Sequence, residues 1–532
     1  MQPTETRQAW IKGLVLEISR PSLKDNTADR DRLLKEARKV LGAGDVTMDL
    51  PLTRRLPSLL RESGFKVGVV LFRDGDIWRV MDLYPARKTP RLFGLAVDLG
   101  TSTVVIRLVD LAEGRGVDEV SFLNPQRPMG EDILSRIHFA SGENGLYALH
   151  SALIKGINEK IGVLVRRHGL AKESLAGMVL AGNTTMTHLF LGLDPFWICR
   201  EPYIPVVNRT GILRAEALGL FIHPNAPVLV FPNVGSYFGG DLIAGILASG
   251  MARRKEISLL VDVGTNAEVV LGNREWLMGC AGAAGPALEG GVASIGMMAG
   301  PGAIDRVRID PDSGEPEIRT IGDQPPTGIC GSGLIDLAAQ LFLTGMIDLR
   351  GKFVKEVCGD KLREIDGIAH LVLVPAGASG TGEDLTLGQP DLDALIRSKA
   401  AMYTILVTIT RMANLSFEEI HHFLVAGTFG TTIDPRSAIT IGMLPDLPPD
   451  RFRTLGNTSL EGATLALLSY GAMEEAERIR DNVTYIELNV NQEFMNRFSA
   501  AKFIPHTDTS LFPSVKVARV SKAMMTSSPK EA

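Results

Sequence analysis

The feature that most constrains the fold is a short segment that occurs twice in the chain. LAVDLGTSTVVI at 95–106 matches LLVDVGTNAEVV at 259–270 in its Leu, Val, Asp, Gly and Thr and in a later Val. Each copy reads as an apolar strand, an Asp, a Gly-Thr turn and a second strand. Two matches in the same strand–turn–strand context indicate a duplication. We therefore expect two similar lobes, each beginning with such a hairpin, with a cleft between them.

The two turns carry the groups that a nucleotide triphosphate needs. Phosphate binding requires backbone N–H groups and hydroxyls, a glycine that permits close approach, and a divalent ion that neutralises charge. The residues that supply these groups are Asp98, Gly100, Thr101, Ser102 and Thr103 in the first copy, and Asp262, Gly264, Thr265 and Asn266 in the second. A single D-x-G-T segment is better explained by a tight turn. Two copies in matching contexts favour phosphate binding.

The carboxylates suggest the chemistry. Asp98 and Asp262 are suited to hold Mg²⁺, mostly through water, and, as the catalytic pair, to orient a water for attack on the γ-phosphate. Asp241 follows two glycines at the start of an apolar helical pattern, where it serves either as an outer Mg²⁺ carboxylate or as a helix N-cap.

Two further glycine-rich segments are candidate nucleotide contacts. In HFLVAGTFG (422–430) an apolar strand ends in a turn whose Gly427, Thr428 and Gly430 would let the backbone lie beneath an adenine or ribose. The stretch 279–291 has Glu289 as its one charged side chain. A loop under the nucleotide and plain close packing explain that stretch equally well.

Length and texture indicate more than one domain. A chain of 532 residues is too long for one core and suggests about three domains. The expected divisions are a linker-like segment at 1–25, a small α+β middle domain at 26–91, a first ATPase lobe at 92–255, a second ATPase lobe with the candidate adenosine loop at 256–515 and a flexible tail at 516–532. Within the small domain the pattern predicts a helix over 29–41 that ends at Gly42, and a hairpin turn at Asp74-Gly75.

The composition excludes several function classes. A net charge of −5 with only short basic clusters gives no footprint for nucleic-acid binding. We also expect no secretory signal and no membrane span, which points to the cytoplasm. The four cysteines, Cys199, Cys280, Cys330 and Cys358, have no C-x-x-C spacing, and we expect reduced cysteines that pack as small hydrophobic residues.

Seven stretches in combination resemble a known family. They are LAVDLGTSTVV (95–105), FLNPQRPMGEDILSRI (122–137), LAGNTTMTHLFLG (180–192), LLVDVGTNAEVVLGN (259–273), AGAAGPALEGG (281–291), GICGSGLIDL (328–337) and IPHTDTSLFPSV (504–515). They are similar to the ATP-dependent reductive activators of corrinoid proteins, a branch of the superfamily of acetate and sugar kinases, heat-shock chaperones and actin. The resemblance implies an α/β, actin-like, two-lobed ATPase domain with duplicated RNase H-like subdomains after a small α+β domain. It also places an adenosine loop at 422–430.

The resemblance further implies a function. Such activators reduce the Co(II) of a corrinoid protein to Co(I) for a methyltransferase system, with ATP binding or hydrolysis driving the step, and they form homodimers. They normally carry an iron–sulfur domain, and the cysteines of this chain cannot form its four-cysteine cluster. The electron is therefore expected from a ferredoxin-like donor or an iron–sulfur domain outside this chain, unless the redox role has been lost. A cluster shared between subunits through Cys280 and Cys330 is a weaker alternative. The other readings are a small-molecule kinase of the same superfamily and a nucleotide-dependent binding or chaperone-like protein without redox work.

Overall fold

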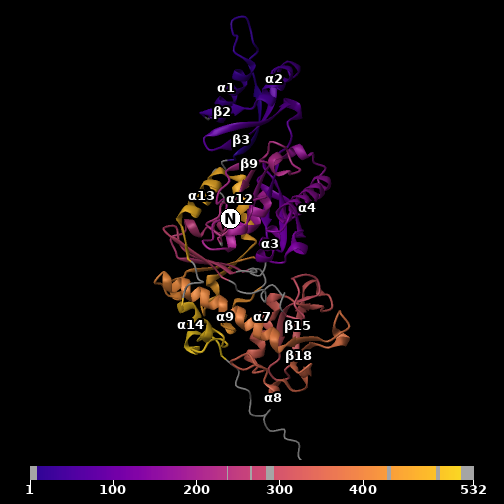
Figure 1. Ribbon diagram of the computed structural model, residues 1–532, viewed down its shortest axis with the longest axis vertical. Helices are drawn as coiled ribbons and strands as arrows, with labels where there is room; N and C mark the ends of the chain where they lie inside the picture. The colour runs from indigo at the N-terminus through magenta and orange to yellow at the C-terminus, as the bar shows by residue number, and fades with distance from the viewer. Residues whose placement is uncertain are drawn as a thin grey trace, which may run out of the picture. The chain divides into compact units, whose positions relative to one another are not determined.

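The computed structural model describes residues 9–42, 44–236, 238–263, 267–282, 293–427, 433–486 and 492–516. These residues form two compact units. The first contains the chain up to residue 248 together with residues 458–482, and the second contains residues 249–457 and those from 483 onward. The elements of each unit are coloured by residue number in Figure 1.

The first unit begins with a small α+β domain. Its elements are β1 (Ile11–Glu17), α1 (Asp29–Leu41), β2 (Asp45–Met48), α2 (Leu50–Glu62), β3 (Lys66–Asp74) and β4 (Ile77–Pro85). The strands form one sheet in the order β1-β3-β4-β2, and the apolar faces of α1 and α2 share a core with it. The helix predicted over 29–41 is confirmed, and Gly42 ends it in the left-handed conformation at φ 61°. The hairpin turn lies one residue later than predicted, because Asp74 pairs with Ile77 and leaves Gly75-Asp76 as the loop.

A six-stranded sheet follows in the same unit. Its strands are β5 (Phe93–Leu99), β6 (Thr103–Asp110), β7 (Arg115–Leu123), β8 (Leu175–Gly182), β9 (Ile212–Arg214) and β10 (Pro227–Val230), in the order β7-β6-β5-β8-β10-β9. Its helices are α3 (Ile133–Ala140), α4 (Gly145–Arg167), α5 (Thr184–Leu191) and α6 (Gly240–Ser249). Every residue of β8 is buried, as expected for a central strand covered on both faces.

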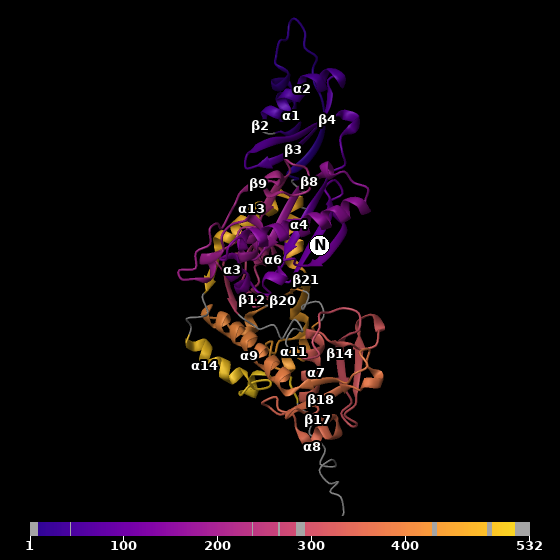
Figure 2. The same cartoon turned by 45° about the vertical axis from the view of Figure 1, so that its right-hand side comes forward.

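Two helices from late in the chain complete the first unit. α12 (Thr458–Leu468) packs on β5 and β8, and α13 (Tyr470–Asn482) follows it. Both are drawn in yellow among the magenta elements in Figures 1 and 2. A Cβ on Gly462 would lie 2.2 Å from the carbonyl oxygen of Ala244, so this glycine lets α12 cross α6 at close range. The division expected from sequence places residues 458–482 in the second lobe, because chain order alone does not show that these helices pack in the first unit.

The second unit has its own six-stranded sheet. Its strands are β11 (Ser258–Val263), β12 (Ala267–Gly272), β13 (Leu277–Gly282), β20 (His422–Ala426), β21 (Phe452–Gly456) and β22 (Val483–Ile486), in the order β21-β20-β11-β12-β13-β22. The helices of this unit include α7 (Gly331–Leu343), α8 (Lys355–Cys358), α9 (Gln389–Met412), α11 (Pro435–Thr440) and α14 (Gln492–Ala501). α9 and α14 pack against each other. No helix in the described ranges is both long and apolar enough to span a bilayer.

Two three-stranded sheets branch from the second unit. One has the order β15-β14-β16 and the other β17-β18-β19. Their strands are β14 (Ala303–Ile309), β15 (Pro316–Thr320), β16 (Gly328–Ile329), β17 (Leu362–Ile365), β18 (Ile368–Val374) and β19 (Leu385–Gly388). Residues from both small sheets join the large hydrophobic core of this unit, which also includes the buried faces of α7 and α9.

Five strands have the same order in the two large sheets. The order β7-β6-β5-β8-β10 in the first corresponds to β13-β12-β11-β20-β21 in the second. In both sheets the first three of these strands pair antiparallel and the last two run parallel to the central one. β9 is the additional edge strand of the first sheet and β22 that of the second. The duplication predicted from the two hairpins is therefore confirmed, and it extends over five strands.

Candidate functional site

The repeated aspartates occupy equivalent positions in the two sheets. Asp98 lies near the end of β5, opposite Val105 on β6 and Ala181 on β8. Asp262 lies near the end of β11, opposite Glu268 on β12 and Ala426 on β20. Each carboxylate is partly buried and stands where a hairpin meets the end of a parallel strand. Ligand sites of α/β sheets are typically found at such strand ends.

The first turn is fixed by hydrogen bonds that other residues donate to its carbonyl oxygens. Asn124 donates its side-chain N–H to the oxygen of Gly100 at 2.9 Å and its backbone N–H to the oxygen of Ser102 at 2.9 Å. Arg136 donates Nη2 to the oxygen of Thr101 at 2.7 Å. The backbone N–H groups of Thr101 and Ser102 donate to no other residue in the described part of the chain. The carbonyls are thus turned away and two donors remain for an anion, the arrangement of a phosphate nest.

Glycine is required at the first position of this turn. A Cβ on Gly100 would lie 2.5 Å from the carbonyl oxygen of Thr103. Because that neighbour is backbone and cannot move aside without opening the turn, the site admits no larger residue. Thr101, Ser102 and Thr103 are all partly exposed, so the hydroxyls predicted to contact phosphate are available at the surface of the turn.

A second group of polar residues adjoins the same turn. Asn183 begins α5 by accepting from the N–H of Met186 at 2.9 Å, and its Nδ2 donates to the hydroxyl of Thr101 at 3.1 Å. A Cβ on Gly239 would lie 2.4 Å from Oδ1 of Asp241 and 2.5 Å from Cα of Asn183, so the three residues are close together. Asp241 is not an N-cap, because α6 begins at Gly240 and Asp241 lies in its first turn. The structure therefore places Asp241 beside the Thr101 turn.

The second hairpin differs from the first in its register. Its last described pair is Val263 with Ala267, whereas the first hairpin closes with Leu99 and Val104, so the first turn is one residue longer. The shift puts Glu268 opposite Asp262, and residues directly opposite in an antiparallel pair point to the same face. Two acidic side chains therefore share a face of the second sheet, where the first has Asp98 and Val105.

Part of the predicted site lies outside the described residues. This holds for Gly264, Thr265, Asn266, Glu289, Thr428 and Gly430. Gly427 is described, directly after β20 and with a positive φ of 82°. Its position matches that of Gly182, since Ala426 pairs with Asp262 as Ala181 pairs with Asp98. The segment FLVAG at 423–427 is thus the second copy of MVLAG at 178–182, a correspondence that the sequence analysis missed.

Three functional candidates had no role assigned from sequence. Asn124, Arg136 and Asn183 lie in stretches quoted only for the family resemblance. Asn124 and Arg136 have 1% and 0% of their surface exposed. The available signal was a polar residue within or directly after an apolar run, since such residues are buried only with partners.

The cysteines do not form a metal site in the described part of the chain. All four are free thiols, with Cys280, Cys330 and Cys358 buried. Burial raises the pKa of Cys280 strongly and that of Cys358 to about 11, which disfavours the thiolate that a metal requires. No group of three or more His, Cys, Asp or Glu suited to a metal ion occurs among the described residues.

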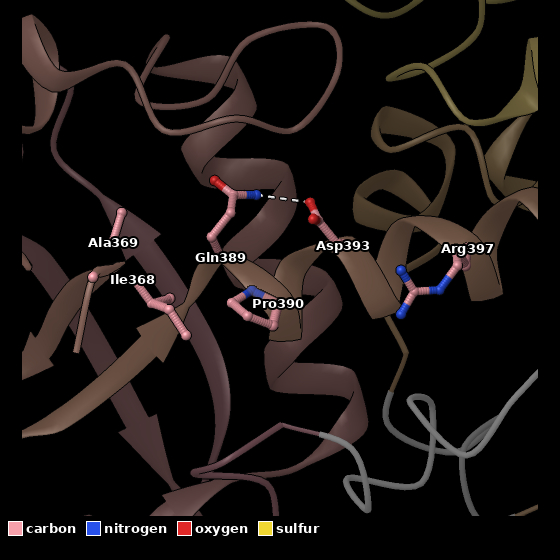
Figure 3. Close-up of a pocket in the computed structure, with 7 residues that line it drawn as sticks. Ile368, Ala369, Gln389, Pro390, Asp393 and Arg397 are labelled. Carbon is pink, nitrogen blue, oxygen red and sulfur yellow. Dashed lines mark hydrogen bonds between the residues drawn. The ribbon is translucent and has the colours of Figure 1, made fainter. Parts of the chain in front are cut away.

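An open pocket in the second unit contains none of the predicted residues. Gln389, Pro390, Asp393 and Arg397 of α9 line it together with residues 367–369, and its volume is about 380 Å³ (Figure 3). Asp393 accepts a hydrogen bond from Nε2 of Gln389 at 2.8 Å and forms an ion pair with Lys352 at 2.8 Å. The carboxylate charge of Asp393 is thus balanced locally by Lys352.

The paired sheets define a class of protein. Two sheets of shared strand order, each with an Asp-bearing hairpin beside a parallel strand, are the architecture of the acetate and sugar kinases, heat-shock chaperones and actin. Residues 256–516 match the family described as the C-terminal domain of RACo, the ASKHA domain. Residues 93–254 match the RACo middle region and residues 7–90 the RACo linker region, so the small domain at 26–91 corresponds to the linker region and not to the middle domain expected from sequence. The predicted fold class is confirmed.

Individual relatives agree with these matches. The chain is 32% identical over 432 residues to the corrinoid activation enzyme RamQ of Eubacterium limosum, covering 79% of this chain and 72% of that protein. It is 23% identical over 440 residues to the [Co(II) methylated amine-specific corrinoid protein] reductase of Methanosarcina barkeri, covering 76% of each. A solved reductive activator for a corrinoid, iron–sulfur protein superposes with a TM-score of 0.90 at 39% identity, covering 97% of this chain and 82% of that one. This chain belongs to the RACo family of reductive activators of corrinoid proteins.

Proposed function

We propose that this protein couples ATP binding or hydrolysis to the reduction of Co(II) to Co(I) in a partner corrinoid protein of a methyltransferase system. The observation that carries the proposal is the combination of two Asp-bearing hairpins in duplicated sheets with relatives named for corrinoid activation and Co(II) reduction. One relative acts on a methylated amine-specific corrinoid protein by its name, and another on a corrinoid, iron–sulfur protein.

ATP binding or hydrolysis would act by changing the relative affinity of the activator for two states of the corrinoid protein. Reduction to Co(I) is uphill for ordinary donors, so the activator must bind one state of the corrinoid protein better than another. A shift of a two-state equilibrium from 1:99 to 99:1 requires a differential of about 5.5 kcal/mol. An ATP cycle can supply a free energy of this size if the lobes respond to the γ-phosphate.

The acidic residues have separate proposed roles. Asp98 and Asp241 adjoin the phosphate turn of the first sheet and would hold Mg²⁺ through its waters. Asp262, in the second sheet, would likewise hold Mg²⁺ through water and would orient the attacking water. Mg²⁺ commonly uses one or two carboxylates together with substrate phosphates and water, so it does not need a cluster of three protein acids. Its chemistry when bound is neutralisation of the phosphate charge.

An iron–sulfur cluster does not fit the cysteines of this chain. Three of the four thiols are buried, and none has the short spacing that clusters use. The electron is therefore proposed to come from a ferredoxin-like donor or an iron–sulfur domain outside this sequence. We further propose a homodimer acting in the cytoplasm, in keeping with the family resemblance.

A reconstituted reaction tests the proposal. The full chain, ATP–Mg²⁺, a low-potential electron donor with a ferredoxin and a cob(II)alamin protein are mixed, and the Co(I) absorption band is followed. We expect the band to appear only with ATP. If no Co(I) forms while a small metabolite becomes phosphorylated, the protein is a kinase instead. ATP hydrolysis stimulated by a partner protein, without either product, would indicate a binding protein without redox work.

A further inference from the structure

Arg136 is a fully buried cation for which the described residues provide no acidic partner. It lies on α3 with none of its surface exposed. Its Nε donates to the oxygen of Gly130 at 2.9 Å, Nη1 to Oε1 of Gln126 at 3.3 Å, and Nη2 to the oxygen of Thr101. All these acceptors are neutral. The nearby Asp132 caps α3 through the N–H of Ser135 and forms no ion pair with Arg136.

The surrounding segment is built around this guanidinium. A Cβ on Gly130 would lie 2.8 Å from the backbone nitrogen of Arg136 and 2.9 Å from its Cγ. Gln126 is itself buried and is fixed by a hydrogen bond from its Nε2 to the oxygen of Leu149 at 3.0 Å. Burying a guanidinium without an acid is costly, and the cost is visible as a pKa lowered by burial to about 10. An anion bound nearby would offset this cost.

Arg32 provides a contrast within the same chain. It is also buried, in the small domain, and donates to the oxygens of Thr27 at 2.8 Å and Asp25 at 2.6 Å and to the hydroxyl of Ser19 at 3.1 Å. Unlike Arg136, it also forms an ion pair with the carboxylate of Asp25. Its charge is neutralised on the spot, and its role is to order the loop between β1 and α1.

We propose that Arg136 is a positioning residue for the nucleotide phosphates, a proposal that rests on the proposed function. Its guanidinium holds the Thr101 carbonyl behind the turn, so that the N–H groups of Thr101 and Ser102 face the ligand. It also provides a positive charge behind the turn that the bound phosphates neutralise. The ligand class is a nucleoside di- or triphosphate with Mg²⁺, and the residue does not contact the adenosine.

The test compares nucleotide binding in matched variants of the full chain. Calorimetric titrations with ATP–Mg²⁺, ADP–Mg²⁺ and adenosine are run on wild type, Arg136→Met, Arg136→Lys and the control Arg32→Met. We expect Arg136→Met to weaken ATP–Mg²⁺ and ADP–Mg²⁺ binding 10- to 100-fold and to leave adenosine binding within twofold. Arg136→Lys retains the charge but not the three-way hydrogen bonding, and should recover part of the loss. Arg32→Met should change none of the three affinities.

Steady-state hydrolysis separates positioning from chemistry. Arg136→Lys should raise KM for ATP with little change in kcat, since the residue acts on the bound phosphates in the ground state and the transition state alike. The inference would be overturned if the Arg136 variants bound ATP–Mg²⁺ and ADP–Mg²⁺ as tightly as wild type. It would also be overturned if their affinity for adenosine fell by the same factor as their affinity for the two nucleotides. If Arg136→Met does not fold, the lysine variant and its KM decide the question. A wild-type chain that binds no ATP would instead refute the proposed function.

Discussion

The two large sheets share five strands but differ at their Asp-bearing hairpins. In the first, the carbonyl oxygens of Gly100, Thr101 and Ser102 are fixed from behind by Asn124 and Arg136. In the second, a turn shorter by one residue brings Glu268 opposite Asp262, so that two acids share a face. The two hairpins are similar in sequence, but their pairing registers differ by one residue. This shift changes which side chain lies opposite the aspartate. We interpret the first turn as a phosphate cradle and the second hairpin as the carrier of an acidic pair.

The largest effect that tests this division is expected at Asp262. Asp262→Asn should lower the rate of ATP hydrolysis about 100- to 1,000-fold, because general-base and water-orienting groups contribute on that scale. Glu268→Gln should cost roughly tenfold, through loss of the neighbouring charge. The measurement is kcat with saturating ATP–Mg²⁺ and a corrinoid partner.

Asp98→Asn is the matched control for Asp262→Asn. It should raise KM for ATP–Mg²⁺ roughly tenfold and change kcat less, since Asp98 has Val105 and not an acid opposite it. Equal losses of kcat in Asp98→Asn and Asp262→Asn would mean that the two hairpins act equivalently, and the proposed division would be wrong.

The two units should also differ in how their stability depends on pH. In the second unit the dependence comes from Lys399. This lysine on α9 has none of its surface exposed, and its Nζ donates to the carbonyl oxygens of Phe503 and Pro505. Burial lowers the pKa of Lys399 to about 7 from 10.5. Between these values the folded chain binds fewer protons than the unfolded chain, so stability should rise with pH from about 7 to about 10, by roughly a few kcal/mol.

Chemical denaturation from pH 7 to 10 measures this rise. In Lys399→Met the slope of stability against pH should be shallower by the contribution of one proton, although the variant is less stable throughout because two buried carbonyls lose their donor. An unchanged slope would show that Lys399 keeps an ordinary pKa in the folded protein.

In the first unit the pH dependence of stability should appear at acid pH. It comes from a carboxylate where the small domain contacts the first sheet. Asp82 of β4 accepts hydrogen bonds from Nε2 of His223 at 3.1 Å, from Arg55 at 2.9 Å and from the N–H of Leu83 at 2.8 Å. Burial alone would raise the pKa of Asp82, but the hydrogen bonds from His223 and Leu83 outweigh it and lower the pKa to about 2. This stabilisation is present above about pH 4 and should be lost as the pH falls toward 2.

Asp82→Asn tests that window. We expect it to remove about 2 kcal/mol at pH 7 and to flatten the loss of stability between pH 4 and pH 2, as followed by equilibrium unfolding. Lys399→Met is the control here, because it should leave the acid limb unchanged. If Asp82→Asn and wild type lose stability in parallel below pH 4, the carboxylate does not hold the two parts of the first unit together.

The sequence predicted the hairpins and the fold class because both depend on local pattern. An Asp at the end of an apolar strand followed by Gly-Thr is recognisable in twelve residues, and its repetition implies the architecture. Strand register is not local, so the ungapped alignment of 95–106 with 259–270 hid the one-residue shift that places Glu268 opposite Asp262. The return of α12 to the first unit was hidden for the same reason. Arg136 was missed because it has no acidic partner in the described chain and two of its acceptors are backbone oxygens, which leave no mark in a sequence.

The smallest effect concerns Asn183, at the position where the two copies of the strand-end segment diverge. MVLAG at 178–182 is followed by Asn183, and FLVAG at 423–427 by Thr428. Asn183 has two functions, since its oxygen caps α5 and its Nδ2 donates to the hydroxyl of Thr101. Asn183→Ala removes both, and should cost about 1 kcal/mol of stability and weaken ATP binding several-fold.

Asn183→Thr places the residue of the second copy in the first and separates the two functions of Asn183. The threonine hydroxyl can cap α5, so most of the stability should return. It cannot reproduce the reach of the amide toward Thr101, so ATP affinity should stay as low as in Asn183→Ala. Thermal unfolding and nucleotide titration measure the two properties independently. Recovery of both in Asn183→Thr would mean that the cap alone matters, and that the turns of the two sheets are interchangeable at this position.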